Sequence, residues 1–557
     1  MSEQTIGFNE LPEEYNPYSI GSNTHHEFWA DAVADEVEAN AKSEPIVIKG
    51  GISPSGIPHL GNANEIVLGY LVAEVLRERG YEVNQVFTAD DRDPLRGLPR
   101  KLADLDGNIV GLGDVDAGAL GRNLGKPYTD IPDPFGCCDS YGAHFSNLIR
   151  DIATDLDIPI ELKSNTELYE SGEFEGLTTD LLRNQSTASA VLSKYQDTVG
   201  DDYIPFNPIC TNCGKITETV TSIDIEAQTV EYECTDIEAG DQIIEGCGHV
   251  GEVSIRDGKL PWRFEWVAQW NLLNVDFEPF GKDHAEGSWP SGVDIAKNVF
   301  DFEPPTPMVY EWFTLEDKPF SSSEGHIVLV SEVLELIEPE VLLYFFAKDP
   351  TKARDFSIER LDQLVNEFDR IERIALGKQD AEEDEKAYAK RVYPFLVDTV
   401  EEDRIRIPYT FAAVLGMTDD QEMREEVARR QGHIPEDAPD WAVEDALTRV
   451  ERARQWAERT NNEYNYELKR ESMPEVDIDE KTAVALDELA AFIETHDDPD
   501  TIQGAIFEIA RDHDIEVGDF FTTGYQLFFG LEEGPKLGHF LAKLDKQFVL
   551  KRLRREE

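Results

Sequence analysis

The sequence predicts an α/β protein: a doubly wound parallel sheet, interrupted by an insertion and followed by an α-helical C-terminal part. Three observations lead to this fold class. Residues 45–90 follow the order strand, turn, helix, strand, and the stretches 275–284 and 307–317 read as further strands that end in polar loops. A βαβ unit is the first part of a doubly wound sheet. Beyond about residue 331, apolar residues recur at the spacing of a helix.

The βαβ unit is read element by element. Its first strand, 44–49, contains the β-branched run Ile-Val-Ile, which is typical of a buried strand. The turn and helix start are written GGISPSGIPHLGNANE, residues 50–65, and the helix 65–80 stops at a glycine. The second strand, 82–88, ends just before the acidic run ADDRD. These acidic residues therefore lie at the carboxyl edge of the sheet, where such sheets bind ligands.

The chain of 557 residues is too long for one hydrophobic core, so we expect three or more domains. Residues 1–135 and 259–330 are the two halves of the sheet domain, 136–258 is an insertion with all six cysteines, 331–400 is a helical connection, and 401–557 is an α-helical domain. Individual helices are predicted at 331–348, 361–376, 443–460, 483–496 and 548–557. The charge run 378–388 is a solvated helix face or a linker.

The charge balance is strongly acidic, with 51 Lys and Arg against 114 Asp and Glu and a formal net charge of −63. The 28 Phe, 18 Tyr and 8 Trp argue against a disordered chain. The composition therefore indicates a folded protein adapted to molar salt, where the Debye length is only about 3 Å. Acidity neither supports nor excludes an RNA partner. No long apolar run and no signal-peptide pattern is present, so we expect a cytoplasmic protein without a membrane partner.

The turn between the first strand and the first helix is the main candidate for a ligand site. A strand-to-helix turn directs backbone N–H groups and the positive end of a helix dipole at one point, which suits a phosphate. The residues able to contact a ligand there are glycines, hydroxyls and two further donors: Gly51, Ser53, Ser55, Gly56, His59, Gly61 and Asn62. An ordinary Gly/Pro-rich connection with a surface histidine is the alternative.

The insertion contains a second candidate site. The spacing of four of its cysteines predicts a zinc knuckle with four thiolate ligands: Cys210, Cys213, Cys234 and Cys247. The acidic stretch 235–246 separates the last two, and His249 could replace one of them. A reducing compartment argues against disulfides. The adjacent Cys137 and Cys138 are interpreted as packing residues and not as ligands.

Several stretches together resemble one enzyme family. PSGIPHLGN places His59-Leu60-Gly61-Asn62 where class I aminoacyl-tRNA synthetases carry their HIGH signature, and KPFSSSEGH lies where they carry KMSKS. GISPSG, DDRDPLRGLP, GKPYTDIPDPFG, VDFEPFGKDHAEGSWPSG, YEWFTLED and GPKLGHFLAKL follow in matching order over nearly the whole chain. In these stretches the sequence is similar to the class I lysyl-tRNA synthetases of the archaeal type, here in a halophile-adapted form.

This resemblance implies a Rossmann-type class I synthetase catalytic domain, a cysteine-bearing insertion with zinc, and an α-helical anticodon-binding domain. It also implies the activity: L-lysine is activated with ATP to lysyl-adenylate and transferred to tRNA(Lys), with Mg²⁺ assisting. The family pattern assigns the following residues to ATP binding: Ser53, Pro54, Ser55, Gly56, His59, Gly61, Asn62 and Lys318. It assigns catalytic roles to His59, Asn62, Ser321, Ser322 and Ser323. Residues for the amino acid are Gly51, Ser53, Asp93, Trp262, Asp283, His284 and Tyr310, beside Gly281.

The lysine side chain needs an anionic partner for its ammonium group and apolar walls for its stem. Candidate carboxylates are Asp91, Asp93 and Glu265, and candidate walls are Trp262, Trp266, Trp270 and Tyr310. The tryptophans could instead be core or interface aromatics. Carboxylates beside an aromatic cluster would also suit arginine, so a class I synthetase for another amino acid is an alternative.

The second signature departs from the family pattern, because Pro319, Phe320 and Glu324 replace its first Lys, its Met and its last Lys. Lys318 could cover part of the lost charge, with Mg²⁺ and serine backbone amides supplying the rest. A paralogue that binds tRNA or nucleotide but catalyses weakly is therefore a further alternative. A tRNA-independent adenylyltransferase is another, although it would need neither the helical tail nor the cysteine insertion.

Overall fold

The computed structural model describes residues 11–12, 15–19, 26–197, 199–200, 202–240, 242–320, 325–469, 472–532 and 536–556. The chain forms two compact units. Unit 1 comprises Met1–Val333, Leu343–Ser357 and Ala381–Leu396, and unit 2 comprises Leu334–Leu342, Ile358–Asp380 and Val397–Glu557. The predicted helical connection 331–400 is therefore shared between the two units. Within the described part of the chain, no helix combines the length and the apolar character needed to span a membrane.

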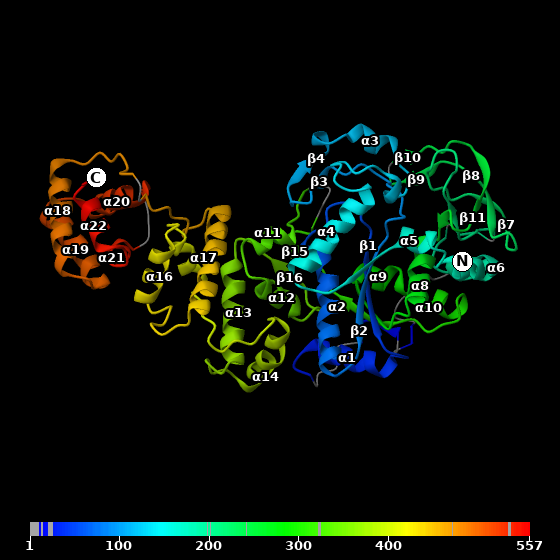
Figure 1. Cartoon of the computed structure of the whole chain (residues 1–557), viewed down its shortest axis with the longest axis horizontal. Coiled ribbons are helices and arrows are strands. Elements are labelled where there is room, and N and C mark those ends of the chain that lie inside the picture. Colours follow the sequence, from blue (N-terminus) through cyan, green and yellow to red (C-terminus); the bar gives the residue numbers. More distant parts are fainter. Residues whose placement is uncertain are drawn as a thin grey trace. The chain divides into compact units, whose positions relative to one another are not determined.

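Unit 1 is built on a five-stranded sheet with the order β14-β13-β1-β2-β5. Figure 1 labels two of its strands, β1 and β2. Its strands are β1 Ile46–Ile52, β2 Val83–Ala89, β5 Glu161–Ser164, β13 Phe277–Gly281 and β14 Thr306–Tyr310. All four neighbouring pairs are parallel. From β1 the chain adds β2 and β5 on one side of the sheet and then β13 and β14 on the other. The sheet is therefore doubly wound, and its strand order reverses between β1 and β13. The first three predicted strands beyond β1 are confirmed as β2, β13 and β14.

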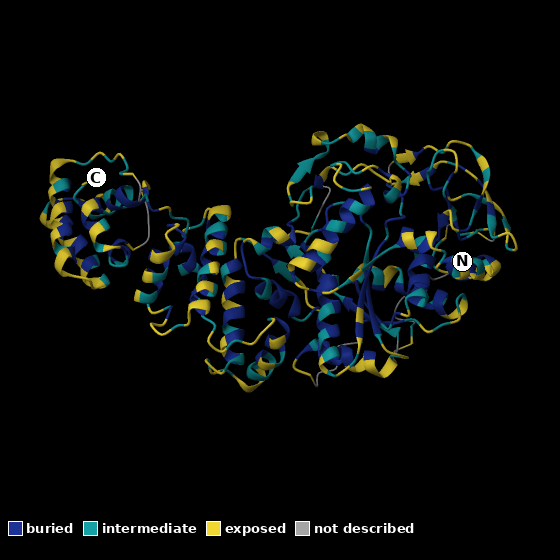
Figure 2. Ribbon diagram, in the orientation of Figure 1, coloured by how far each residue is buried: buried dark blue, intermediate teal, exposed yellow. Residues whose placement is uncertain are grey.

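Helices cover both faces of this sheet, and Figure 2 shows its central strands as buried. Helix α2, Leu60–Glu78, joins β1 to β2 and ends before Gly80, whose φ of +98° favours glycine. On the opposite face, Val47 of β1 belongs to a buried cluster with Trp270 of α8 and Trp289 of α10. The further helices of unit 1 are α1 Trp29–Asn40, α3 Ala117–Arg122, α4 Tyr141–Asp155, α5 Asn165–Glu170, α6 Glu175–Arg183, α7 Gln185–Leu192, α8 Trp262–Leu272, α9 Lys282–Gly287, α10 Trp289–Asn298 and α14 Glu383–Val392.

The predicted insertion 136–258 contributes one strand to the main sheet, because β5 pairs with β2. Its cysteine-bearing part is a small antiparallel sheet of β7 Val220–Asp224, β8 Thr229–Glu233 and β11 Val250–Ser254. Short strand pairs complete unit 1: β3 Lys101–Ala103 with β4 Ile109–Gly111, β6 Asn207–Pro208 with β12 Gly258–Lys259, β9 Ile237–Ala239 with β10 Gln242–Ile244, and β15 Phe313–Leu315 with β16 Arg354–Phe356.

Unit 2 is α-helical, as predicted. Its helices are α13 Leu361–Ala375, α15 Tyr409–Leu415, α16 Gln421–Arg430, α17 Asp440–Thr460, α18 Glu480–Thr495, α19 Pro499–Asp512, α20 Val517–Phe529, α21 Leu537–Leu541 and α22 Lys546–Leu553. The helix predicted at 331–348 is instead two helices, α11 Val330–Leu334 and α12 Pro339–Ala347. The break falls where Pro339 opens the second helix, because proline is accepted in the first turn of a helix and not in its interior.

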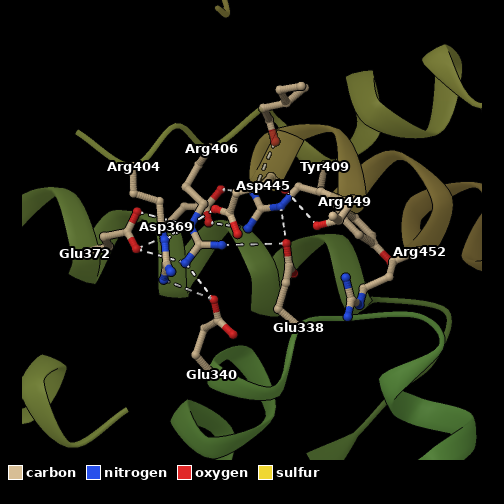
Figure 3. A network of polar contacts seen from close by, with 12 residues as sticks. Glu338, Glu340, Asp369, Glu372, Arg404, Arg406, Tyr409, Asp445, Arg449 and Arg452 are labelled. Carbon is tan, nitrogen blue, oxygen red and sulfur yellow. Dashed lines mark hydrogen bonds and ion pairs between the residues drawn. The ribbon is translucent and has the colours of Figure 1, made fainter. Parts of the chain in front are cut away.

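A buried network of charges joins several segments of unit 2 (Figure 3). Arg449 of α17 is 1% exposed and donates to Glu338 at 2.5 Å and to both oxygens of Asp369 at 2.7 and 2.9 Å. Arg406 donates to Glu372 at 3.0 Å and to Glu340 at 2.8 Å. Burial alone would raise the pKa of Glu338, but the two arginines outweigh it and hold that pKa at about 2. Such a network is costly to break, because any single loss leaves an uncompensated buried charge.

Candidate active site

A cavity of about 640 Å³ opens at the carboxyl ends of β1 and β13. This is the place where the strand order reverses, and ligands of doubly wound sheets bind in that crevice. Gly51 and Ser53 reach the cavity from the end of β1, Gly281 and Asp283 from the end of β13, and Tyr310 from the end of β14. The sheet topology therefore brings together residues that are far apart in the sequence.

Most of the predicted site residues meet in this cavity. Those that line it are Gly51, Ser53, His59, Gly61, Asn62, Asp93, Trp262, Asp283, His284 and Tyr310. Ser55 and Gly56 line a neighbouring cavity of about 490 Å³, to which Ser53, His59 and Asn62 also belong. Pro54 is buried, and Lys318 is exposed and lines neither cavity. Ser321, Ser322 and Ser323 lie outside the described residues, so their role stays a prediction.

His59 closes the N-terminus of α2. Its Nδ1 accepts a hydrogen bond from the Gly61 N–H at 3.1 Å, and the Asn62 side chain accepts from the His59 N–H at 2.9 Å. The Leu60 N–H donates to the Val328 carbonyl at 2.9 Å. The backbone donors that the sequence assigned to a phosphate are thus partly used within the protein. Side-chain donors at this turn include the His59 Nε2–H and the Asn62 amide, beside the hydroxyls of Ser53 and Ser55.

The imidazole of His59 is held neutral. Burial lowers its pKa to about 4, so the ring carries no charge at neutral pH. With Nδ1 acting as acceptor, the proton lies on Nε2. Phe320 stacks on the ring with centroids 4.9 Å apart and planes at 12°. The ring is therefore fixed in place with one neutral donor available to a ligand.

Acidic groups dominate the main cavity. Among the described residues that line it, five are acidic (Glu65, Asp90, Asp93, Glu278 and Asp283) and one is a lysine, Lys49. Lys49 is already paired with Glu278 at 2.8 Å, and Glu278 also accepts from the Trp266 indole at 3.0 Å. Outside the lining, Lys259 contacts Asp93. The cavity is therefore lined by more acidic than basic side chains.

Two of these carboxyl groups resist ionisation. Burial raises the pKa of Glu65 to about 8, and repulsion from Glu278 adds to the shift. Burial and repulsion from Asp93 raise the pKa of Asp90 to about 6. Glu65 accepts from the Gly51 N–H at 2.8 Å and from the Tyr310 hydroxyl at 3.2 Å, which fixes its position at the end of β1. A cation in the cavity would stabilise the charged form of both groups.

The structure separates the other predicted candidates. Asp91 accepts from the Ser164 hydroxyl at 2.5 Å and does not line the cavity. Glu265 is paired with Lys259 at 2.7 Å, also outside the lining. Trp262 and Trp266 form walls, and Trp262 stacks on His284 with centroids 5.3 Å apart. Trp270 is 1% exposed and belongs to the core, as the alternative interpretation of the tryptophans had it.

Sequence reasoning missed Glu65, Lys49 and Glu278. Lys49 interrupts a strand that is otherwise apolar, and a charged residue in a buried strand was a signal that pointed to it. Glu65 lies six positions after His59 on the same helix, and its return to the end of β1 follows only from the packing of α2 on the sheet. Glu278 lies 229 positions from its partner Lys49, so no local pattern relates them.

The four predicted cysteines come together in the insertion. Their sulfur atoms all lie within 4.8 Å of one another, with Cys210 and Cys247 at 3.6 Å and Cys213 and Cys234 at 3.7 Å. Four thiolates at about 2.3 Å from a tetrahedral zinc would be about 3.8 Å apart, so the spacing fits. His249 instead lies 3.3 Å from the Thr211 hydroxyl and is not part of the cluster.

The remaining two cysteines lie in a second cluster of polar side chains. Asp133, Cys137, Cys138 and His144 bring four possible ligand atoms within 4.8 Å of one another. Cys137 is exposed, and its sulfur lies 3.4 Å from His144 Nδ1. His144 is fully buried and its Nε2 lies 2.9 Å from the Ala103 carbonyl. The set groups sulfur, nitrogen and oxygen atoms of the kinds that bind metals. The interpretation of the two cysteines as packing residues and not as ligands stays a prediction.

Comparison with known proteins agrees with this geometry. The model of the family described as tRNA synthetases class I (K) matches residues 27–396. The chain belongs to this family. A lysine–tRNA ligase of Halobacterium salinarum is 66% identical over 531 residues, which cover 95% of this chain and 97% of the relative. A lysine–tRNA ligase of Haloarcula marismortui is 62% identical over 97% of this chain and 99% of its own.

The similarity extends beyond salt-loving archaea. A lysine–tRNA ligase of Pyrococcus furiosus is 32% identical over 95% of this chain and 99% of its own length. Family membership, the doubly wound sheet, the cysteine cluster and the helical unit 2 together confirm the predicted fold class, a class I synthetase with a cysteine-bearing insertion and an α-helical C-terminal part.

Proposed function

We propose that the chain is a lysine–tRNA ligase. It activates L-lysine with ATP to lysyl-adenylate and transfers the lysyl group to tRNA(Lys) in the cytoplasm. The observation that supports a cationic amino acid is the cavity with five acidic groups, one paired lysine and a Glu65 pKa of about 8. The near full-length similarity to lysine–tRNA ligases supports lysine over arginine.

Lysine would bind with its ammonium group at Glu65. An ammonium group beside this carboxyl stabilises its charged form and makes a charge-assisted hydrogen bond with it. Trp262, Trp266 and His284 would enclose the aliphatic stem. Gly51 has no room for a side chain, because an added Cβ would lie 2.5 Å from the Thr88 hydroxyl. Glycine at this position therefore lets β1 pack against Thr88 of β2.

In the activation step, a carboxylate oxygen of lysine forms a bond to the α-phosphorus of ATP. The bond from that phosphorus to the bridging oxygen breaks, and its electron pair leaves with pyrophosphate. The protein supplies position and charge stabilisation and needs no covalent intermediate. In this proposal the His59 Nε2–H and the Asn62 amide donate to the phosphoryl oxygens, and Mg²⁺ bound with ATP would supply further positive charge.

We also propose structural zinc at Cys210, Cys213, Cys234 and Cys247, which the sulfur spacing supports. When bound there, zinc would tie the chain segments on either side of β7 and β8 together. The test of the function as a whole is charging of tRNA(Lys) with radiolabelled lysine in high potassium chloride. Absence of charging with lysine at every salt concentration would favour the weakly catalytic paralogue.

A further inference from the structure

The triphosphate of ATP needs positive charge close to it. Among the described residues that line the main cavity, no lysine or arginine side chain lacks an acidic partner. Phosphoryl transfer depends on cationic groups that neutralise the charge of the leaving phosphates. Among the described residues, the one lysine that lines the main cavity, Lys49, is bound to Glu278, and five acidic side chains lie around it. A tail with several negative charges placed there would be repelled. The same charges suit the ammonium group of the amino acid.

The neighbouring cavity has the opposite character. It is lined by Arg100 and Lys101, and no acidic residue is among the described residues that line it. The two cavities share Ser53, His59 and Asn62, so a ligand held by His59 reaches both. Such a cavity is unusual in a chain with 114 acidic and 51 basic residues. Within the part of the chain that the structure describes, neither Arg100 nor Lys101 makes an ion pair.

The side chains of Arg100 and Lys101 are exposed, and the backbone that carries them is anchored. Lys101 opens β3 and pairs with Gly111 of β4, and the Arg100 carbonyl accepts from the Leu112 N–H at 3.1 Å. Leu102 of β3 shares a buried cluster with Ile57 of the His59 turn, so the hairpin and the turn pack together. The Lys101 side chain also lies against Gly325, where it leaves no room for a Cβ. The charges are therefore positioned beside the turn.

We propose that Arg100 and Lys101 bind the β- and γ-phosphates of ATP and stabilise the pyrophosphate that leaves. This inference rests on the proposed function and adds to it the group that supplies positive charge. The two cavities then divide the substrates by charge: the cationic amino acid lies in the acidic cavity, the phosphate tail lies in the basic one, and the α-phosphate lies between them at His59. Exposed Lys318, which lines neither cavity, is not required.

The test compares ATP with AMP, which lacks the two distal phosphates. Arg100→Gln and Lys101→Gln are each expected to weaken ATP binding by about 10- to 100-fold, the range for a hydrogen bond between charged groups. Affinities for AMP and for lysine should stay within twofold, which also shows that the variants are folded. Arg100→Lys and Lys101→Arg should keep most of the ATP affinity. Binding is measured by calorimetry in high potassium chloride with tRNA(Lys) present.

Two further variants set the comparison. Arg96→Gln is the matched control, because Arg96 lies in the same segment, pairs with Glu218 and lines neither cavity. Lys318→Gln tests the competing cation. The proposal is overturned if Arg100→Gln and Lys101→Gln bind ATP like Arg96→Gln, if ATP and AMP affinities fall equally, or if only Lys318→Gln weakens ATP. A wild-type protein without lysine-dependent pyrophosphate exchange would overturn the proposed function itself.

Discussion

Glu65 makes lysine binding depend on pH in a way that can be calculated. Its pKa of about 8 in the empty protein means that roughly 3% of molecules carry the charged carboxylate at pH 6.5 and roughly 24% at pH 7.5. Lysine keeps its charged ammonium group throughout this range and binds the ionised form. Its affinity should therefore rise about eightfold from pH 6.5 to 7.5, as binding releases one proton. The affinity for lysine falls toward acid pH because the raised pKa of Glu65 favours its neutral form, and lysine binds the ionised form.

Glu65→Gln removes the charge while it keeps an acceptor for the Gly51 N–H. The variant should lose the pH dependence in this range and, at pH 8.5, bind lysine about 3 kcal/mol more weakly, roughly 150-fold. Glu74→Gln is the matched control, because Glu74 lies on the same helix and pairs with Arg77 at the surface. Quenching of tryptophan fluorescence by lysine in high potassium chloride measures both effects. The reasoning fails if Glu65→Gln keeps the pH dependence, or if its affinity matches that of Glu74→Gln.

Further predictions concern the remaining parts of the molecule. Because the pKa of His59 is about 4, the rate at saturating substrates should show no step near pH 6.5, and His59→Ala should lower it about 100- to 1,000-fold. Cys234→Ser should remove one zinc per chain and lower the melting temperature, which metal analysis and calorimetry check; an unchanged zinc content would contradict the cysteine site. Arg449→Met should destabilise unit 2 by about 3–5 kcal/mol in urea unfolding, because Glu338 and Asp369 lose their buried partner; a change under 1 kcal/mol would contradict this. Dialysis into water should abolish the circular dichroism of folded protein, and an unchanged spectrum would count against salt adaptation.

Local patterns were enough to predict the elements that carry the site. The β-branched run before the glycine turn and the helical spacing after it are short-range signals, and they placed His59 and Asn62 at the start of α2. The family resemblance assigned Gly51 and Asp283 to one site, and the parallel sheet brings them together because the carboxyl ends of its strands meet at one edge. Cysteine spacing also predicted the four-sulfur cluster, because Cys210 and Cys213 are close in the sequence and lie in one tight turn.

Long-range pairings were beyond the reach of the sequence. The bond between Lys49 and Glu278 and the return of Glu65 to the end of β1 depend on how α2 and β13 pack, and no periodicity encodes that. The short strand β5 was hidden because only four residues, ELKS, pair with β2 and their pattern is polar. The cluster around His144 was missed because it combines three residue types, aspartate, cysteine and histidine, and attention to cysteine pairs alone does not reveal it.

Lysine-dependent exchange of pyrophosphate into ATP shows whether the chain activates lysine. The protein is assayed in high potassium chloride with tRNA(Lys), with each of the twenty amino acids in turn. We expect exchange with lysine and little with any neutral amino acid, because the cavity is acidic. We expect little exchange with arginine, because the similarity to lysine–tRNA ligases supports lysine. Exchange with a different amino acid, or with none, would contradict the proposed function.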